Sequence, residues 1–407
     1  MHKSEIQSEN LALLKSQYSN EGILAVRESF EDSFRKFFEE CNYTEVAPLP
    51  LLSDQDNSVI YTGASISALK DILLSQNYPD GTNGVFVSQE CLRTGAKDRM
   101  LERDWVPFGQ IYFQMISNLS IPYRFKDVFK EAIDFTQKVV GIEKERIKIL
   151  SSKNLGQIDD LEQLTDLEVE YDTRDQSFYN WKYGIDGVKG EGLTIAVYNP
   201  SIDNWMEVGN IVIIYDESGK ELGIEFGYGY EYFLTAALGL DNPLKLSKVF
   251  EVFDFEPGLL LKYYYNLEAI ANMKIAGSHV GEYGAEYVYR KYLKYLLHNG
   301  GLVGKNSDEI LHDLSKYGES FHNTDIDLSE EREFFKKHQM RKDNFRSLVN
   351  RVWDHLNDLR NNVKPKERKL NPVKVIKHFL SKNGLNIEEV TDSLEVLREF
   401  DILDKLN

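Results

Sequence analysis

The chain has 407 residues, which allows two to four domains, and its 42% hydrophobic and 28% charged residues are typical of a soluble globular protein. No apolar run is long enough to span a bilayer, and the N-terminus lacks the apolar stretch of a secretory signal. The net charge of -18 argues against a general nucleic-acid coat protein, and two cysteines cannot build a disulfide framework. We therefore expect a soluble cytoplasmic protein.

The first part of the chain alternates predicted helices and strands. Residues 5–41 are expected to form one helix, because four phenylalanines between residues 30 and 38 recur on one helical face. Strands are predicted at 58–62 and 84–88 from their β-branched and aromatic residues, with a helix at 65–74 between them. Another buried strand is predicted at 111–120.

The alternation continues to about residue 240. A helix is predicted over 125–141 and a second over 230–239, while 151–180 is expected to hold a short helix and loops. Residues 216–219 are typical of a hairpin turn. The remaining predicted strands are 147–150, 193–198, 207–215 and 222–226.

Strand signals disappear after residue 245, and the rest of the chain is predicted to be helical. Because the earlier strands follow one another with few helices between them, we expect a mostly antiparallel sheet. The predicted fold is α+β over 1–242, followed by an all-α domain over 243–407. Net charge is also segregated, at -17 over 1–240 and +9 over 331–382. The basic stretch could hold a phosphate backbone or be an ordinary solvated helical face.

Five segments resemble, in the same order, parts of alanyl-tRNA synthetase, a class II aminoacyl-tRNA synthetase. SQECLRTGAKDRMLE with YFQMISNLS resembles its motif 2, the hairpin over the nucleotide, and GIEFGYGYEYFLTAAL resembles its motif 3. The last segment resembles the helices that dock the tRNA acceptor stem. The resemblance implies a class II synthetase fold and a ligase that uses ATP with Mg²⁺. The five segments are 50–71, 88–120, 209–215, 223–238 and 266–304.

Joining an amino-acid carboxylate to the α-phosphate of ATP brings two anions together, so cations are required. The resemblance implies that Arg93 is the motif 2 arginine, whose guanidinium can hold both anions, and that Lys97 is a second cation on the same loop. Each residue is also compatible with an ordinary surface charge. These two are the candidate catalytic residues.

The resemblance also implies two binding sets. Glu225 stands where the family has an aspartate that pairs with the substrate ammonium, and its extra methylene would alter the pocket and the amino acid chosen. Several of these residues have an ordinary structural alternative: Asn210 could hydrogen-bond to the backbone, Phe113 could be a core residue, and Gly227 with Gly229 could mark a strand bulge. The amino-acid set is Asn210, Glu225 and Gly227, and the ATP set is Arg93, Arg99, Phe113, Gln114, Gly229 and Tyr232.

Several positions depart from the family pattern. Tyr232 replaces the motif 3 arginine, and Phe108 with its two successors replaces an Arg-His pair. Gln114 replaces a glutamate, and Ile195 replaces a further acidic residue. Either ATP is bound differently, through Arg93 and its neighbouring cations, or the ATP site has decayed. No histidine or cysteine pattern indicates a protein-bound zinc.

Arg290, Lys291 and Lys294 alternate with tyrosines on one predicted helix, which the resemblance implies faces an acceptor stem. Together with Arg341 in the basic stretch they are the candidate RNA-binding residues, although a packed helix with snorkelling lysines has the same pattern. Two functions remain open. One is a specialised ligase that activates a small amino acid with ATP and passes it on, with tRNA as the candidate acceptor; the other is a pseudo-synthetase that binds RNA or protein. The sequence predicts no oligomeric state.

Overall fold

The chain forms two compact units, Met1–Asp327 and Leu328–Asn407. The domain boundary predicted between 242 and 243 falls inside the first unit and stays a prediction. Within the second unit, residues 329–340 are helical. In this computed structural model the described residues are 11–16, 18–19, 22–52, 59–95, 100, 108, 110–152, 161–171, 176–253, 259–322 and 326–340.

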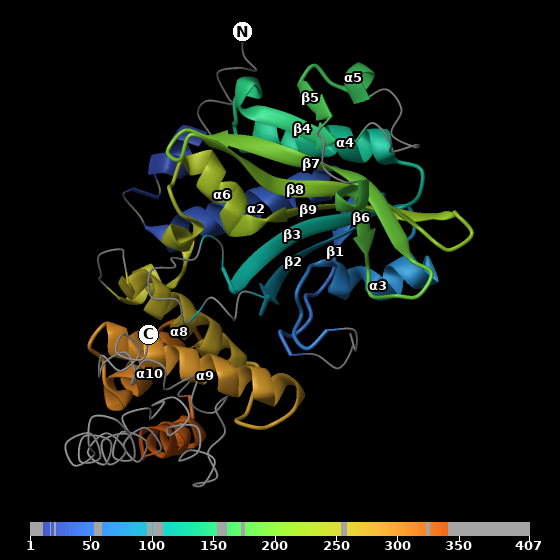
Figure 1. The fold of residues 1–407 in the computed structure, drawn as a ribbon. Helices are drawn as coiled ribbons and strands as arrows, with labels where there is room; N and C mark the ends of the chain where they lie inside the picture. The colour runs from blue at the N-terminus through green and yellow to red at the C-terminus, as the bar shows by residue number, and fades with distance from the viewer. Residues whose placement is uncertain are drawn as a thin grey trace, which may run out of the picture. The chain divides into compact units, whose positions relative to one another are not determined.

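One nine-stranded sheet organises the first unit (Figure 1). The order is β1-β2-β3-β9-β8-β7-β4-β5, with β6 paired to β7. The β1–β2 and β4–β5 pairs are parallel and the other pairs are antiparallel, which confirms the predicted mostly antiparallel α+β fold. The strands are β1 (Tyr43–Glu45), β2 (Gly84–Leu92), β3 (Tyr112–Ser120), β4 (Ile147–Ser151), β5 (Glu168–Tyr171), β6 (Asn180–Lys182), β7 (Lys189–Asn199), β8 (Asn204–Tyr215) and β9 (Glu221–Gly229).

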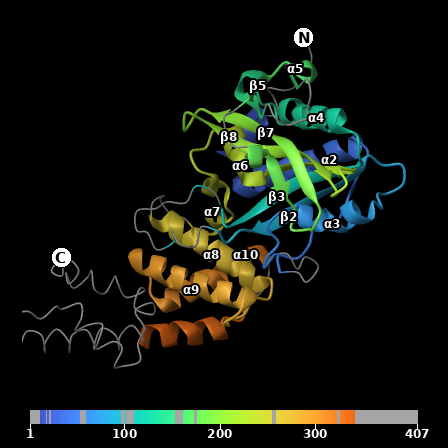
Figure 2. The same cartoon turned by 45° about the vertical axis from the view of Figure 1, so that its right-hand side comes forward.

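Helices cover both faces of this sheet (Figures 1 and 2). Side chains of α2, α4 and α6 join the main core on one face, called here the α2 face. On the other face, the α3 face, side chains of α3 pack against β2, β3 and β8. The helices are α2 (Ile23–Glu40), α3 (Ile66–Ser75), α4 (Phe125–Asp134) and α6 (Tyr230–Leu238), with a short α5 (Leu161–Leu164) between β4 and β5.

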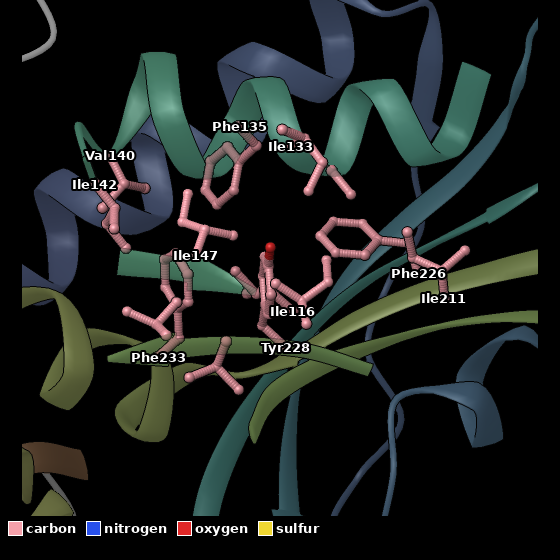
Figure 3. Packing of buried hydrophobic residues seen from close by; sticks show 14 of the residues in the cluster. Ile116, Ile133, Phe135, Val140, Ile142, Ile147, Ile211, Phe226, Tyr228 and Phe233 are labelled. Carbon is pink, nitrogen blue, oxygen red and sulfur yellow. The ribbon is translucent and has the colours of Figure 1, made fainter. Parts of the chain in front are cut away.

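Aromatic rings fill the core on the α2 face (Figure 3). Phe30 on α2 meets the ring of Tyr230 edge-on at 5.0 Å, and Phe135 stacks on Phe233 at 6.3 Å. Pairs of this kind stabilise a core beyond the area they bury. The apolar stripe of the predicted N-terminal helix therefore faces the sheet. That helix is interrupted, however, because Gly22 adopts φ 93° and α2 begins only at Ile23.

The loop before α3 differs from the prediction. Residues 59–62 form no strand, and Val59 and Ile60 are exposed. Their β-branched side chains predict a strand, but the backbone here bonds to a loop residue: the Thr62 N–H donates to the Leu51 carbonyl at 2.8 Å. Residue 58 lies outside the described part. The sequence patterns do not predict the short strands β1, β5 and β6.

The chain beyond the sheet is helical in its described residues, as predicted. The α8–α9 pair and α10 bury tyrosines and leucines against one another. No helix in the described ranges is long and apolar enough to cross a membrane. The helices are α7 (Val249–Val252), α8 (Leu259–Ile275), α9 (Gly284–Leu302) and α10 (Ser307–His322).

Candidate functional site

The candidate site lies on the α3 face, across five neighbouring strands from β2 to β7. Directly opposed residues of antiparallel strands project to the same side of a sheet, so the pairing defines rows of side chains. Two adjacent rows carry the residues predicted to meet the amino acid. The first row is Val85, Leu119, Glu225, Val212 and Gly192, and the second row is Val87, Ser117, Gly227, Asn210 and Thr194.

Glu225 is the charged member of the first row. It stands between Leu119 and Val212, and the Tyr183 hydroxyl donates to its Oε2 at 3.0 Å. Burial raises the pKa of Glu225 to about 7, although the Tyr183 hydrogen bond and the positive charge of Arg93 act in the opposite direction. An approaching ammonium group would favour the ionised form of this carboxyl.

The second row is polar on both sides of a glycine. Thr194 donates its hydroxyl to the Asn210 Oδ1 at 2.9 Å, so the amide nitrogen of Asn210 is its remaining hydrogen-bonding group. On the other side, Ser117 is fully buried, and its Oγ has no hydrogen-bond partner among the described residues. A Cβ at Gly227 would lie 3.2 Å from the Ser117 Cβ, so the glycine keeps the space between Ser117 and Asn210 free of a side chain.

A β-bulge changes the side to which Glu207 projects. β7 and β8 pair Ile195 with Gly209 but Ala196 with Glu207, which leaves Val208 as an extra residue in β8. Val208 and Ile195 belong to the core on the α2 face. Glu207 is consequently turned to the α3 face, where it is exposed.

Arg93 directly follows β2 and lies over the same face. Its Cζ is 5.0 Å from the centroid of the Phe113 ring, and its Nε donates to the Gly63 carbonyl at 2.8 Å. Its Nη2 lies 3.6 Å from the sulfur of Met115. The guanidinium is thus held against an aromatic ring while the residue stays exposed.

Tyr232 lies in the first turn of α6, three residues after Gly229. Its ring packs edge-on against the exposed Phe108 ring at 5.8 Å. Burial raises the pKa of Tyr232 and the charge of Glu207 acts in the same direction, so the hydroxyl stays protonated. A neutral aromatic pair therefore occupies two positions where the resemblance predicts cations. It can stack on a base but cannot neutralise a phosphate.

Gln114 points to the opposite face from Phe113. Its Oε1 accepts from Arg27 at 2.9 Å, and its backbone N–H donates to Glu231 at 3.0 Å. Arg27 and Glu231 form a buried ion pair at 2.8 Å. Burial alone would lower the pKa of Arg27, but Glu231 more than compensates and the pKa lies above its ordinary value. The structure does not bring the Gln114 side chain to the other predicted ATP-binding residues.

The α9 helix carries three of the predicted RNA-binding residues. The guanidinium of Arg290 lies 5.6 Å from the ring of Tyr287 and 3.8 Å from the carboxylate of Glu282. Lys291 and Lys294 are partly exposed beside it. The helix buries Leu293, Leu296 and three of its tyrosines, so a packed face and a basic face coexist.

Three predicted cations, Lys97, Arg99 and Arg341, lie outside the described residues, as does most of the basic stretch 331–382. Within the described residues, no three histidine, cysteine, aspartate or glutamate side chains come together as metal ligands. Mg²⁺ that accompanies a nucleotide takes only one or two carboxylates, because phosphates and waters complete its shell. The exposed Glu207 on the α3 face fits that requirement.

The sequence profile of the family "tRNA synthetases class II (A)" matches residues 29–232, about half of the chain. The chain belongs to this family. The matched range includes every site residue on the α3 face described above. The resemblance to alanyl-tRNA synthetase is also confirmed by curated relatives, while the positions of the family's functional residues stay proposals.

This chain is similar to alanine–tRNA ligases of several bacteria. The ligase of Buchnera aphidicola is 30% identical over 184 residues, which is 44% of this chain and 19% of the relative. That of Pseudomonas entomophila is 32% identical over 124 residues, 28% of this chain and 14% of the relative. The match therefore spans less than a fifth of the length of these relatives.

Solved structures of other class II synthetases are similar at low identity. Asparaginyl-tRNA synthetase from Entamoeba histolytica, in complex with asparaginyl-adenylate, matches with a TM-score of 0.36 and 12% identity, over 55% of this chain and 65% of that one. The enzyme from Pyrococcus horikoshii matches with a TM-score of 0.34 and 12% identity, over 55% and 67%.

Sequence reasoning missed five residues of this region. Arg27 could have been found, because it interrupts the apolar stripe of α2 and a charge there needs a buried partner. Ser117 and Thr194 had a weaker signal as hydroxyls inside apolar strands. Tyr183 and Glu207 had no sequence signal. A loop contact brings Tyr183 to Glu225, and a β-bulge turns Glu207 to the α3 face.

Proposed function

We propose that this chain is an alanyl-tRNA-synthetase-like ligase in a specialised role. It activates a small amino acid with ATP as an aminoacyl adenylate and passes the acyl group to an acceptor, with the tRNA acceptor stem as the preferred candidate. The amino-acid carboxylate would attack the α-phosphate, and pyrophosphate would leave.

The arrangement on the α3 face carries this proposal. A guanidinium and a carboxylate of opposite charge, Arg93 and Glu225, lie on one face and within reach of each other's field. An amino acid has the complementary charges, so its carboxylate can lie toward Arg93 and its ammonium toward Glu225. Phe113 under the guanidinium offers a flat surface for adenine.

Phosphate charge must be neutralised with few cations. Among the described residues of the α3 face, Arg93 is the cation over this site, and Glu207 would hold Mg²⁺. Mg²⁺ bound there would supply positive charge to the phosphates. The predicted roles of Lys97 and Arg99 on the same loop add to this set.

The pseudo-synthetase remains a second candidate because of one observation. Phe108 and Tyr232 pack together where the family pattern places cations. A chain that no longer forms adenylates would keep the fold and the basic face of α9.

Pyrophosphate exchange tests the proposal directly. The full chain is incubated with ATP, Mg²⁺, labelled pyrophosphate and each of the twenty amino acids in turn. Exchange that depends on a small amino acid is the expected result. Differential scanning with ATP alone separates the alternatives, because a pseudo-synthetase with a decayed site gives neither exchange nor a thermal shift with ATP.

A further inference from the structure

We propose that the amino-acid subsite selects a small amino acid with a hydrogen-bonding group on its Cβ, and that Ser117 determines this selectivity. Serine is the simplest substrate of this class. The inference rests on the proposed adenylate-forming function. It adds which residue of the α3 face recognises the side chain of the substrate.

The first observation is the state of the Ser117 hydroxyl. Its residue is fully buried in β3, and the Oγ has no hydrogen-bond partner in the described part of the chain. Buried polar groups are nearly always paired, and a hydroxyl left without a partner is unfavourable. Ser120, further along β3 on the α2 face, shows the ordinary case: its Oγ donates to the Asn83 carbonyl at 3.1 Å.

The second observation is what surrounds this hydroxyl. Ser117 is paired directly with Gly227, and Asn210 lies across that glycine on β8. The backbone of Gly227 is therefore flanked by a hydroxyl on one side and an amide on the other. A ligand that lies over the glycine meets both polar groups and no side chain from position 227.

The third observation is the position of the ammonium partner. Glu225 is in the neighbouring row and is the diagonal neighbour of Ser117 on the adjacent strand. Diagonal neighbours lie about 7–8 Å apart at the backbone, and the Ser117 hydroxyl and the Glu225 carboxylate extend from these two positions on the same face. One small substrate can bridge two such groups when its ammonium and its second polar group are on adjacent carbons.

Alanine and glycine are the substrates that this arrangement disfavours. Neither carries a group that can pair with the Ser117 Oγ, so binding of either would leave the hydroxyl unpaired beside the substrate. Sites that hydrogen-bond a substrate hydroxyl strongly reject analogues that lack it, whereas a pocket lined by apolar groups discriminates poorly.

The test compares serine, alanine and glycine in pyrophosphate exchange with three forms of the full chain: unchanged, Ser117→Ala and Ser120→Ala. For the unchanged chain we expect kcat/KM for serine to exceed that for alanine by about 100-fold. Ser117→Ala should reduce this ratio at least 10-fold through loss of serine activity. Because its hydroxyl is unpaired, this variant should melt no lower than the unchanged chain.

Ser120→Ala is the matched control, since it removes a paired hydroxyl from the same strand on the other face. It should lower the melting temperature and leave the serine-to-alanine ratio unchanged. A preference for alanine or glycine in the unchanged chain, or a Ser117→Ala ratio within twofold of it, would overturn the inference and leave the ligase proposal standing. No exchange with any amino acid would reject the proposed function, and this inference with it.

Discussion

The ion pair of Arg27 and Glu231 should be a major determinant of stability, because it ties α2 to the first turn of α6. Both side chains are nearly buried, with 8% and 5% of their surface exposed. Arg27 also donates to the Gln114 Oε1 at 2.9 Å and to the Leu246 carbonyl at 3.1 Å. Removing the guanidinium leaves a buried carboxylate whose charge is no longer compensated.

Replacing Arg27 with methionine keeps most of the side-chain volume and removes the charge. Breaking a buried pair from one side costs about 3–5 kcal/mol. Adding Glu231→Gln removes the stranded charge and keeps an acceptor for the Gln114 N–H, so the double variant should recover most of that loss. The free energy of unfolding is measured by urea titration at pH 7, followed by circular dichroism.

Arg35 provides the control, because it pairs with Glu45 at 3.2 Å on the surface, with 37% and 41% of the side chains exposed. An exposed pair contributes only about 0–1 kcal/mol. Arg35→Met should therefore cost far less than Arg27→Met. Equal losses for the two variants, or a double variant less stable than Arg27→Met alone, would refute this reasoning.

Three further predictions concern titration and charge. Burial raises the pKa of Glu225 to about 7, and the substrate ammonium needs the ionised carboxylate, so kcat/KM for the amino acid should rise as pH increases through 7. Glu225→Gln should abolish this rise, and a flat profile for the unchanged chain would contradict the prediction. Burial also raises the pKa of Glu268 to about 7 from 4.5, so the folded state loses stability as pH rises between these values. In urea unfolding, Glu268→Gln should therefore raise the free energy of unfolding by up to about 3 kcal/mol at pH 8 and by little at pH 4. Reversing Arg290 and Lys294 to Glu should weaken total-tRNA binding in anisotropy titrations and flatten its salt dependence by about two log–log units, while the exposed Lys130→Glu on α4 changes neither.

The sheet and its helices were largely predictable because periodic patterns are local. The strands β3, β7, β8 and β9 and the helices α3, α4 and α6 appear where alternation or 3.6-residue spacing indicated them. The failures have local causes too. The residue types at 59–62 predict a strand, yet the structure forms none over these described residues, where the Thr62 carbonyl bonds to β2, accepting from the Leu92 N–H at 2.8 Å. Gly22 divides a pattern that otherwise predicts one helix.

The candidate site was predictable only in part. Arg93, Asn210 and Glu225 came from the resemblance, and the structure gathers them with Phe113 on one face. Contacts that depend on strand pairing could not be read from sequence. The unpaired hydroxyl of Ser117 becomes visible only once the register of β3 and β9 is known.

The most direct test of the central claim is amino-acid-dependent pyrophosphate exchange by the unchanged chain and by Arg93→Ala. Arg93 is the cation over the amino-acid rows among the described residues, so its removal should abolish exchange. Because Arg93 is exposed, the variant should melt close to the unchanged chain. In parallel, Glu225→Gln should raise KM for the amino acid far more than KM for ATP. Exchange near the unchanged level in Arg93→Ala would contradict the account, because the two reacting anions would then be brought together somewhere else.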